Sequence, residues 1–162
     1  MIDPLQFRLL IIRPALQRLG LWSLAAERLL LGTAIAESWL MALKQKPGPA
    51  LGFYQMEPAT HFDIWKNYLL YRPALALKVK RLAVGRPRAQ QMVWNLYYAS
   101  ALARLQYRRD RFALPDENDL VGLGDYYKRV YTTSEGQGSA ASFVGRMTPF
   151  WGKPTLTLDT LP

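Results

Sequence analysis

The stretch LAAERLLLGTAIAESWLMALK, residues 24–44, decides the fold of this chain. Its apolar side chains surround the predicted helix instead of forming one stripe, and Ser23 stands before it as an N-cap. A helix that is apolar on nearly every side belongs in the centre of a fold. The following Pro47, Gly48 and Pro49 predict a rigid turn that ends this helix.

Helical patterns continue on both sides of this segment. The first covers residues 5–19 and stops at Gly20. A later one runs from Glu57 to Arg72, where either Pro58 occupies the first turn or Thr60 and Asp63 form a capping box. The remaining helices are expected at 74–83, at 88–109, from Asp116 or Asn118 to 131, and at 140–147.

The spaces between these helices leave little room for sheet. Irregular strand is expected only near 51–56, and residues 134–139 are expected to form a loop. We therefore predict an all-α fold of about six to seven helices in one domain over residues 1–148. Residues 149–162 carry prolines and alternating Thr and Leu, which predicts an extended C-terminal tail.

Composition narrows the classes of function. The 162 residues carry a net charge of +9, which favours a polyanionic partner such as the bacterial cell wall, nucleic acid or anionic lipid. The chain has no cysteine and a single histidine, His61, so we expect no metal site, no cofactor and no nucleophile paired with histidine. Neither a signal peptide nor a membrane-spanning segment is predicted.

Glu37 is the residue most suited to chemistry, because it lies among the apolar side chains of the central helix. Burial would disfavour its carboxylate and raise its pKa, and a protonated carboxylic acid is what cleavage of a glycosidic bond requires. The alternative is that Glu37 forms an ion pair, with Lys44 two turns along or with a basic residue elsewhere.

The residues after Glu37 form a pattern that is more specific than a lone acid. Glu37-Ser38 is followed by Ala50-Leu51-Gly52-Phe53-Tyr54-Gln55 and then by Pro58-Ala59-Thr60. This pattern resembles that of the lytic transglycosylases, relatives of goose-type lysozyme. The loop between Lys44 and Pro49 departs from the family pattern, which puts substrate preference more in question than the acid.

The resemblance implies a lysozyme-like domain with a catalytic helix over 23–44 and a Gln loop over 50–56. It implies that Glu37 is the acid that cuts the MurNAc–GlcNAc β-1,4 bond of peptidoglycan. It also implies glycan contacts from Ser38, Gly52, Tyr54 and Gln55, and more weakly from Asn95 and Tyr131, although Thr132 stands where the family has asparagine. Of the other aromatic residues, Tyr97 or Tyr98 competes for a place in the cleft.

The resemblance also implies a mechanism and a setting. One acid without a carboxylate partner favours a 1,6-anhydro product, and Glu57, the nearest second candidate, is interpreted as a helix-start residue. A short chain without a signal peptide suggests a phage protein, made in the host cytoplasm and carried by the virion to the periplasm and cell wall. The tail could then dock on other virion proteins.

Two other hypotheses stay open. The chain could be a structural tail or virion component that keeps a lysozyme-like fold with little activity. It could also bind nucleic acid through the basic helix segment RLQYRRDRF, residues 104–112, although a solvated basic face is favoured there.

Overall fold

The computed structural model describes residues 1–132 and 138–152, and this part of the chain is all-helical with two isolated β-bridges. The helices are α1 Pro4–Gln6, the π-helix η1 Phe7–Ile12, α2 Arg13–Leu19, α3 Leu24–Ser38, α4 Pro58–Asn67, the 3-10 helix η2 Leu69–Tyr71, α5 Pro73–Leu82, α6 Gln91–Trp94, α7 Leu96–Arg108, α8 Leu120–Val130, α9 Ala140–Met147 and the 3-10 helix η3 Thr148–Phe150. The all-α prediction is confirmed. Among the described residues no helix is long and apolar enough to cross a membrane.

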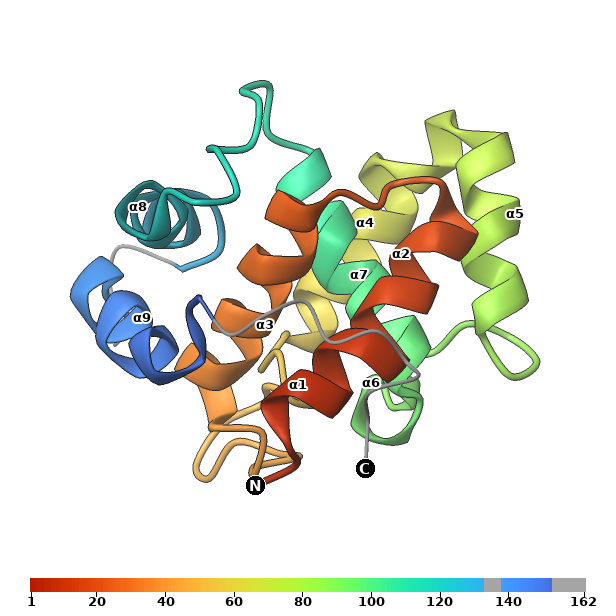
Figure 1. Ribbon diagram of the computed structural model, residues 1–162. Helices are drawn as coiled ribbons and strands as arrows, with labels where there is room; N and C mark the ends of the chain where they lie inside the picture. The colour runs from red at the N-terminus through yellow and green to blue at the C-terminus, as the bar shows by residue number, and fades with distance from the viewer. Residues whose placement is uncertain (133–137, 153–162) are drawn as a thin grey trace.

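The predicted central helix is α3. It begins at the Ser23 N-cap, whose hydroxyl accepts from the Ala26 N–H, and it packs on η1, α7, α8 and α9. Figure 1 shows α8 and α9 on one side of α3 and α2, α4, α5 and α7 on the other. Gly32 allows α9 to come close, because a Cβ there would lie 2.2 Å from the Phe143 ring.

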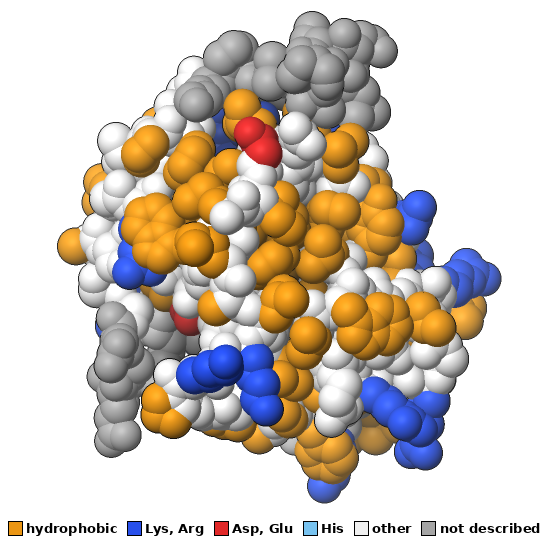
Figure 2. All heavy atoms as spheres, turned by 90° about the horizontal axis from the view of Figure 1, so that it is seen from below, with side chains coloured by type: hydrophobic (Ala, Val, Ile, Leu, Met, Phe, Trp, Pro, Cys, Tyr) orange, Lys and Arg blue, Asp and Glu red, His pale blue; other side chains and the backbone are white. Residues whose placement is uncertain are grey.

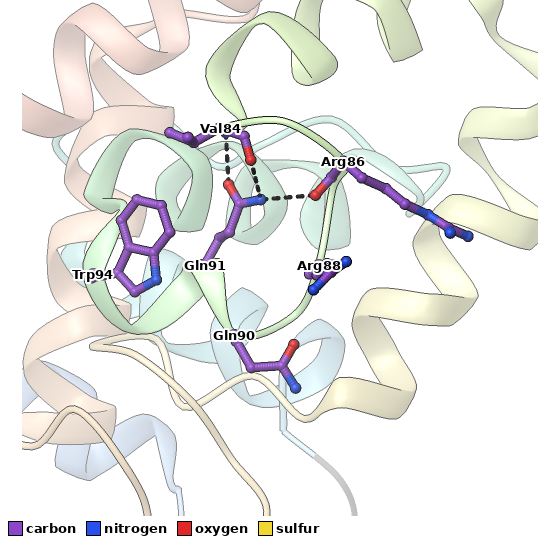
Figure 3. A pocket seen from close by; sticks show the side chains of 6 residues that line it. All are labelled: Val84, Arg86, Arg88, Gln90, Gln91 and Trp94. Carbon is purple, nitrogen blue, oxygen red and sulfur yellow. Dashed lines mark hydrogen bonds between the residues drawn. The ribbon is translucent and has the colours of Figure 1, made fainter.

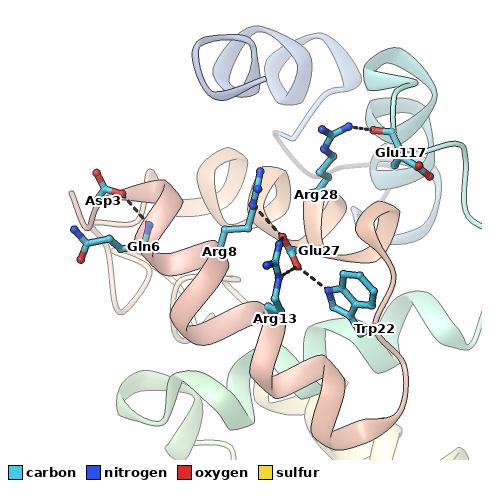
Figure 4. A network of polar contacts seen from close by, with 8 residues as sticks. All are labelled: Asp3, Gln6, Arg8, Arg13, Trp22, Glu27, Arg28 and Glu117. Atoms are coloured by element: carbon cyan, nitrogen blue, oxygen red, sulfur yellow. Dashed lines mark hydrogen bonds and ion pairs between the residues drawn. The ribbon is translucent and has the colours of Figure 1, made fainter. Parts of the chain in front are cut away.

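A buried carboxylate ties the N-terminal helices to α3. Glu27 is fully buried and accepts from Arg13 Nε at 2.8 Å and from Trp22 Nε1 at 2.7 Å, and it forms an ion pair with Arg8 (Figure 4). Removal of one member would strand a buried charge, so this cluster fixes the angle at which η1 and α2 cross α3.

Several predicted boundaries are wrong by a turn or more. The central helix ends at Ser38, not Lys44, because Trp39 and Leu40 adopt positive φ values of 54° and 53° and Leu40 turns into the core. The single helix predicted at 88–109 is two, because the Asn95 side chain starts α7 as its N-cap. Asp119 is the N-cap of α8, in place of Asp116 or Asn118.

Other boundaries agree more closely. Gly20 ends α2 in the left-handed conformation, and Pro58 occupies the first turn of α4 behind the exposed N-cap Glu57. The start of the predicted tail is not extended, since η3 covers Thr148–Phe150 and Trp151 packs under Arg28, with the guanidinium carbon 4.7 Å from the ring centroid. Residues 153–162 of that tail, and most of the loop predicted at 134–139, lie outside the described residues.

Candidate active site

Glu37 is the next-to-last residue of α3, where the buried helix reaches the surface. Its side chain is partly buried, while its neighbours Ala36 and Ser38 are buried. The chain leaves the helix at Trp39, whose left-handed conformation turns the following loop away from the helix axis. The carboxyl group is thus held by a rigid helix and is still reachable from solvent.

Tyr127 of α8 is the direct partner of this acid. Its hydroxyl donates to Glu37 Oε1 at 2.7 Å, although the two residues are 90 positions apart in the sequence. The ring is fixed by stacking on Tyr131, with centroids 6.2 Å apart, and by Phe143 at 5.2 Å. Gly138 leaves room for the hydroxyl, because a Cβ there would lie 2.3 Å from it.

Arg146 of α9 places a positive charge near the same carboxyl group. It donates to the carbonyl of Ala36, and its guanidinium carbon lies 4.8 Å from the centroid of the Trp39 ring. Trp39 is 39% exposed, so part of this side chain, two residues from Glu37, is accessible although Arg146 lies over the ring. Arg146 therefore braces the end of α3 and positions Trp39 at the same time.

Burial and these two partners act on the Glu37 pKa in opposite directions. Desolvation raises the pKa above its ordinary value, whereas the Tyr127 hydrogen bond and the Arg146 charge lower it. The net direction is upward, as the sequence led us to expect. The expected alternative, an ion pair, is not formed: the ion pairs among the described residues involve Glu27, Asp63 and Asp110.

Ser38 joins the acid to the Gln loop over 50–56. Its hydroxyl is buried and lies 2.8 Å from the carbonyl of Phe53 and 3.0 Å from that of Ala34, and it accepts from the N–H of Leu40. The hydroxyl is therefore occupied within the protein. The glycan contact of Ser38 stays a prediction, and the structure gives its hydroxyl a structural role.

Gly52 and Gln55 shape the loop from within. Gly52 has φ +70°, and a Cβ there would lie 2.1 Å from the carbonyl oxygen of Met92, so the close approach that needs glycine is to α6 and not to a sugar. The amide of Gln55 donates to the carbonyls of Gly52 at 2.7 Å and Ala42 at 3.3 Å. Its nitrogen braces the loop, while its side chain stays partly exposed.

Tyr54 and Asn95 are also engaged elsewhere. Tyr54 is 2% exposed and its hydroxyl lies 2.9 Å from that of Ser100, so its side chain packs in the core, and the sugar contact stays a prediction that this burial does not support. Asn95 accepts from the Tyr98 N–H and donates to the Leu82 carbonyl, which uses both ends of its amide in capping α7. The substrate role of Asn95 stays a prediction, and the structure gives the residue a capping role.

The tyrosines that were expected near the acid also bond to other groups. Tyr131 donates to the carbonyl of Tyr54 at 2.9 Å and stacks behind Tyr127, so it lies one layer from the acid. Tyr98 is buried, and its hydroxyl accepts from the Trp65 indole and lies 2.7 Å from Nε2 of His61. Tyr97 donates to the Leu10 carbonyl.

Tyr127, Arg146 and Trp39 are the residues that the sequence analysis missed at this site. The pair Tyr126-Tyr127 on a predicted helix could have indicated Tyr127. Trp39 directly follows Glu37-Ser38, but the expected continuation of the helix assigned it to the core. No local pattern marks Arg146, since α9 meets α3 only in the folded chain.

Comparisons of this chain with protein-family models, curated proteins and solved structures find no match. The resemblance to lytic transglycosylases thus stays a prediction from the sequence pattern. Within the described residues, no three His, Asp or Glu side chains gather in a metal-binding arrangement.

Proposed function

We propose that this protein cuts the glycan strand of peptidoglycan, with Glu37 as the general acid. The observation that carries this proposal is the carboxyl group at the end of the buried helix α3, where desolvation raises the pKa and the Tyr127 hydroxyl fixes one oxygen. A carboxyl group that is oriented, partly exposed and raised in pKa suits protonation of a glycosidic oxygen.

The hydrogen bond to Tyr127 assigns separate tasks to the two carboxyl oxygens. Since the hydroxyl donates to Oε1, that atom is the carbonyl oxygen of the neutral acid, and Oε2 carries the proton. The proton passes from Oε2 to the bridging oxygen of the β-1,4 bond between MurNAc and GlcNAc as the C1–O bond breaks. The resulting carboxylate is then stabilised by Tyr127 and by the charge of Arg146.

The second step uses the same carboxylate as a base. No other Asp or Glu of the described residues contributes to the pKa shift of Glu37, so the two-carboxylate scheme has no support here. The muramic acid 6-hydroxyl bonds to C1 and loses its proton to Glu37, which closes a 1,6-anhydro ring and restores the acid. Water in place of that hydroxyl would give a reducing end.

The surroundings of Glu37 support a glycan as substrate. Trp39 offers an exposed ring for a sugar face, and the partly exposed Gln55 keeps its amide oxygen free of partners among residues 1–132 and 138–152. The net charge of +9 favours a wall that carries peptide carboxylates. As the biological setting we propose a phage virion or lysis protein that acts on the wall.

Digestion of purified peptidoglycan tests the proposal directly. The wild type should release anhydro-muropeptides, identified by mass, and Glu37→Gln should release none, because Gln still accepts from Tyr127 but donates no proton. Reducing-end products from the wild type would show that the enzyme is a hydrolase and not a transglycosylase. No products from a folded wild type would overturn the proposal.

A structural virion component is the second candidate function. It is favoured by one observation: Ser38, Gly52, Tyr54 and Asn95, four of the residues that the resemblance assigned to the glycan, are engaged within the protein. Under this function the fold would persist without cleavage. Wild type and Glu37→Gln would then give the same absence of products at unchanged stability.

A further inference from the structure

A second candidate site lies around Trp94, at the end of α6. Here a hollow of about 390 Å³ is lined by Val84, Arg86, Arg88, Gln90, Gln91 and Trp94, and we call it the Trp94 hollow. Figure 3 shows the indole on one side of Gln91, with Arg88 and Gln90 on the other and Arg86 extending outward from the rim. Glu37 does not line it.

The Trp94 hollow has a fixed frame. The amide of Gln91, which is 5% exposed, accepts from the Val84 N–H at 2.8 Å and donates to the carbonyls of Val84 at 3.0 Å and Arg86 at 2.9 Å (Figure 3). All three bonds hold the loop over 83–90 against α6. The arginines are therefore carried by a braced loop, and the indole by the helix that braces it.

The segment of chain that carries this frame has charged side chains of one sign. Residues 64–109 contain no Asp or Glu, while their basic residues are Lys66, Arg72, Lys78, Lys80, Arg81, Arg86, Arg88, Arg104, Arg108 and Arg109. Within the described part of the chain, neither Arg86 nor Arg88 takes part in an ion pair. Both guanidinium groups remain available for a bidentate contact with a carboxylate.

The indole itself is open from two directions. Trp94 is 58% exposed and also borders a second hollow, lined by apolar residues and Asn95: Ile11, Leu82, Val84, Leu96 and Tyr97. Seen from below, the molecule presents a broad field of hydrophobic side chains with Lys and Arg at its margin (Figure 2). An exposed indole with cations on one side and apolar surface on the other suits a ring that is apolar on its face and anionic at its edge.

We propose that the Trp94 hollow is a second glycan-binding site, which holds a strand whose peptide stems carry free carboxylates. This inference rests on the proposed function for its choice of ligand. A sugar face stacks on Trp94, Arg86 and Arg88 bind stem carboxylates, and the amide of Gln90 bonds to an N-acetyl group.

The surface favours this ligand over single-stranded nucleic acid. A nucleic-acid strand calls for successive stacking rings along a continuous cationic groove. Here Trp94 borders one cationic hollow and one that is lined by apolar side chains, Asn95 and Tyr97, and the Tyr97 ring is covered by the Arg18 guanidinium at 4.8 Å. The arrangement fits a glycan unit with its carboxylates on one side.

The hollow is also connected to the acid through the backbone. Met92 of α6 contacts Gly52 in the Gln loop, and Phe53 of the same loop bonds to Ser38 beside Glu37. A strand held at Trp94 therefore binds to a surface that is rigidly joined to the proposed cleavage site.

Binding and cleavage are separated by measuring both. Binding is measured by sedimenting intact peptidoglycan sacculi with the Glu37→Gln protein, which binds without cutting. Two test variants are made in this background: Trp94→Ala alone, and the double substitution Arg86→Gln and Arg88→Gln. Phe62→Ala controls for loss of an exposed ring, and Arg108→Gln with Arg111→Gln controls for lost charge. Urea midpoints verify that each variant is folded.

We expect each test variant to bind sacculi roughly tenfold more weakly, and the controls to bind unchanged. On chitin oligomers, which carry N-acetyl sugars but no carboxylates, only Trp94→Ala should still reduce binding. Unchanged binding of both test variants would overturn the second site, whatever the wild type releases. Trp94-dependent retention on single-stranded DNA, with Trp94-independent binding to sacculi, would reassign the hollow to nucleic acid.

Failure of the proposed function gives a different pattern. If the wild type releases no products while Trp94→Ala still weakens binding to sacculi, the hollow binds glycan but Glu37 does not cut it. If products are released and Trp94→Ala binds normally, cleavage stands and the second site is wrong.

Discussion

Tyr127→Phe should weaken folding by an amount that depends on pH. The substitution removes only the hydroxyl that donates to Glu37 Oε1 at 2.7 Å, while the ring keeps its contacts with Tyr131 and Phe143. A neutral hydrogen bond contributes about 0.5–1.5 kcal/mol, and one to a charged group about 1.5–3 kcal/mol. We therefore expect a loss of about 1 kcal/mol near pH 4 and about 2 kcal/mol near pH 9.

The sign follows from the protonation of Glu37. Burial raises its pKa in the folded protein above that of the unfolded chain, so the folded state binds more protons between the two values and stability falls as pH rises through that window. Because the Tyr127 hydrogen bond lowers this pKa, its removal raises the pKa further and steepens the fall. Below the unfolded pKa both states are protonated and the effect is smallest.

Urea unfolding at about pH 4 and about pH 9, followed by tryptophan fluorescence, measures both losses. The matched control is the same substitution in a Glu37→Gln background, where the side chain accepts the hydrogen bond but does not ionise. There the loss should be the same at both pH values. An equal loss at both pH values with Glu37 in place, or a pH-dependent loss in the Glu37→Gln background, would refute the assigned hydrogen bond.

Three further predictions concern the surroundings of the acid. Arg146→Gln removes a charge that lowers the Glu37 pKa, so the alkaline limb of the pH–activity profile should move to higher pH; an unmoved limb would contradict this coupling. Gly52→Ala places a Cβ 2.1 Å from the Met92 carbonyl at φ +70°, and urea unfolding should report a loss of more than about 1 kcal/mol. Asn95→Ala deletes the N-cap of α7 and should cost about 0.5–2 kcal/mol by the same assay, whereas a loss only in peptidoglycan binding would support its predicted substrate role.

The central helix could be predicted from the sequence because the residues that indicate it are consecutive. A continuous run of apolar residues behind Ser23 has few alternatives in a chain of this composition. The end of the helix was not predictable in the same way. Residues 39–44 continue the apolar pattern, so helix propensity alone would extend the helix. The Ser38 hydroxyl instead accepts from the Leu40 N–H and bonds to the carbonyl of Phe53, fifteen positions away, and the helix ends at Ser38.

The break at Asn95 has the same cause. The pattern over 88–109 is helical throughout, and asparagine within it lowers helix propensity only slightly. The side chain acts as a cap because it also reaches the carbonyl of Leu82 at the end of α5. That contact depends on how α5 and α7 pack, which no local pattern contains.

The tyrosine that bonds to Glu37 could be predicted only in part from the local sequence pattern, because helix packing also determines which tyrosine it is. Tyr127 and Tyr131, the C-cap of α8, are four residues apart and so lie on one side of this helix, and the resemblance that named Tyr131 pointed to the side that also carries Tyr127. Which of the two meets the acid depends on how far α8 lies along α3. That position is set through α9, where Phe143 fills the space left by Gly32 and packs against the Tyr127 ring in a tilted contact. The burial of Glu37 was therefore predictable from the apolar helix around it and Tyr131 was named only through the family resemblance, whereas the meeting of Tyr127 with Glu37 depends on the packing of three helices.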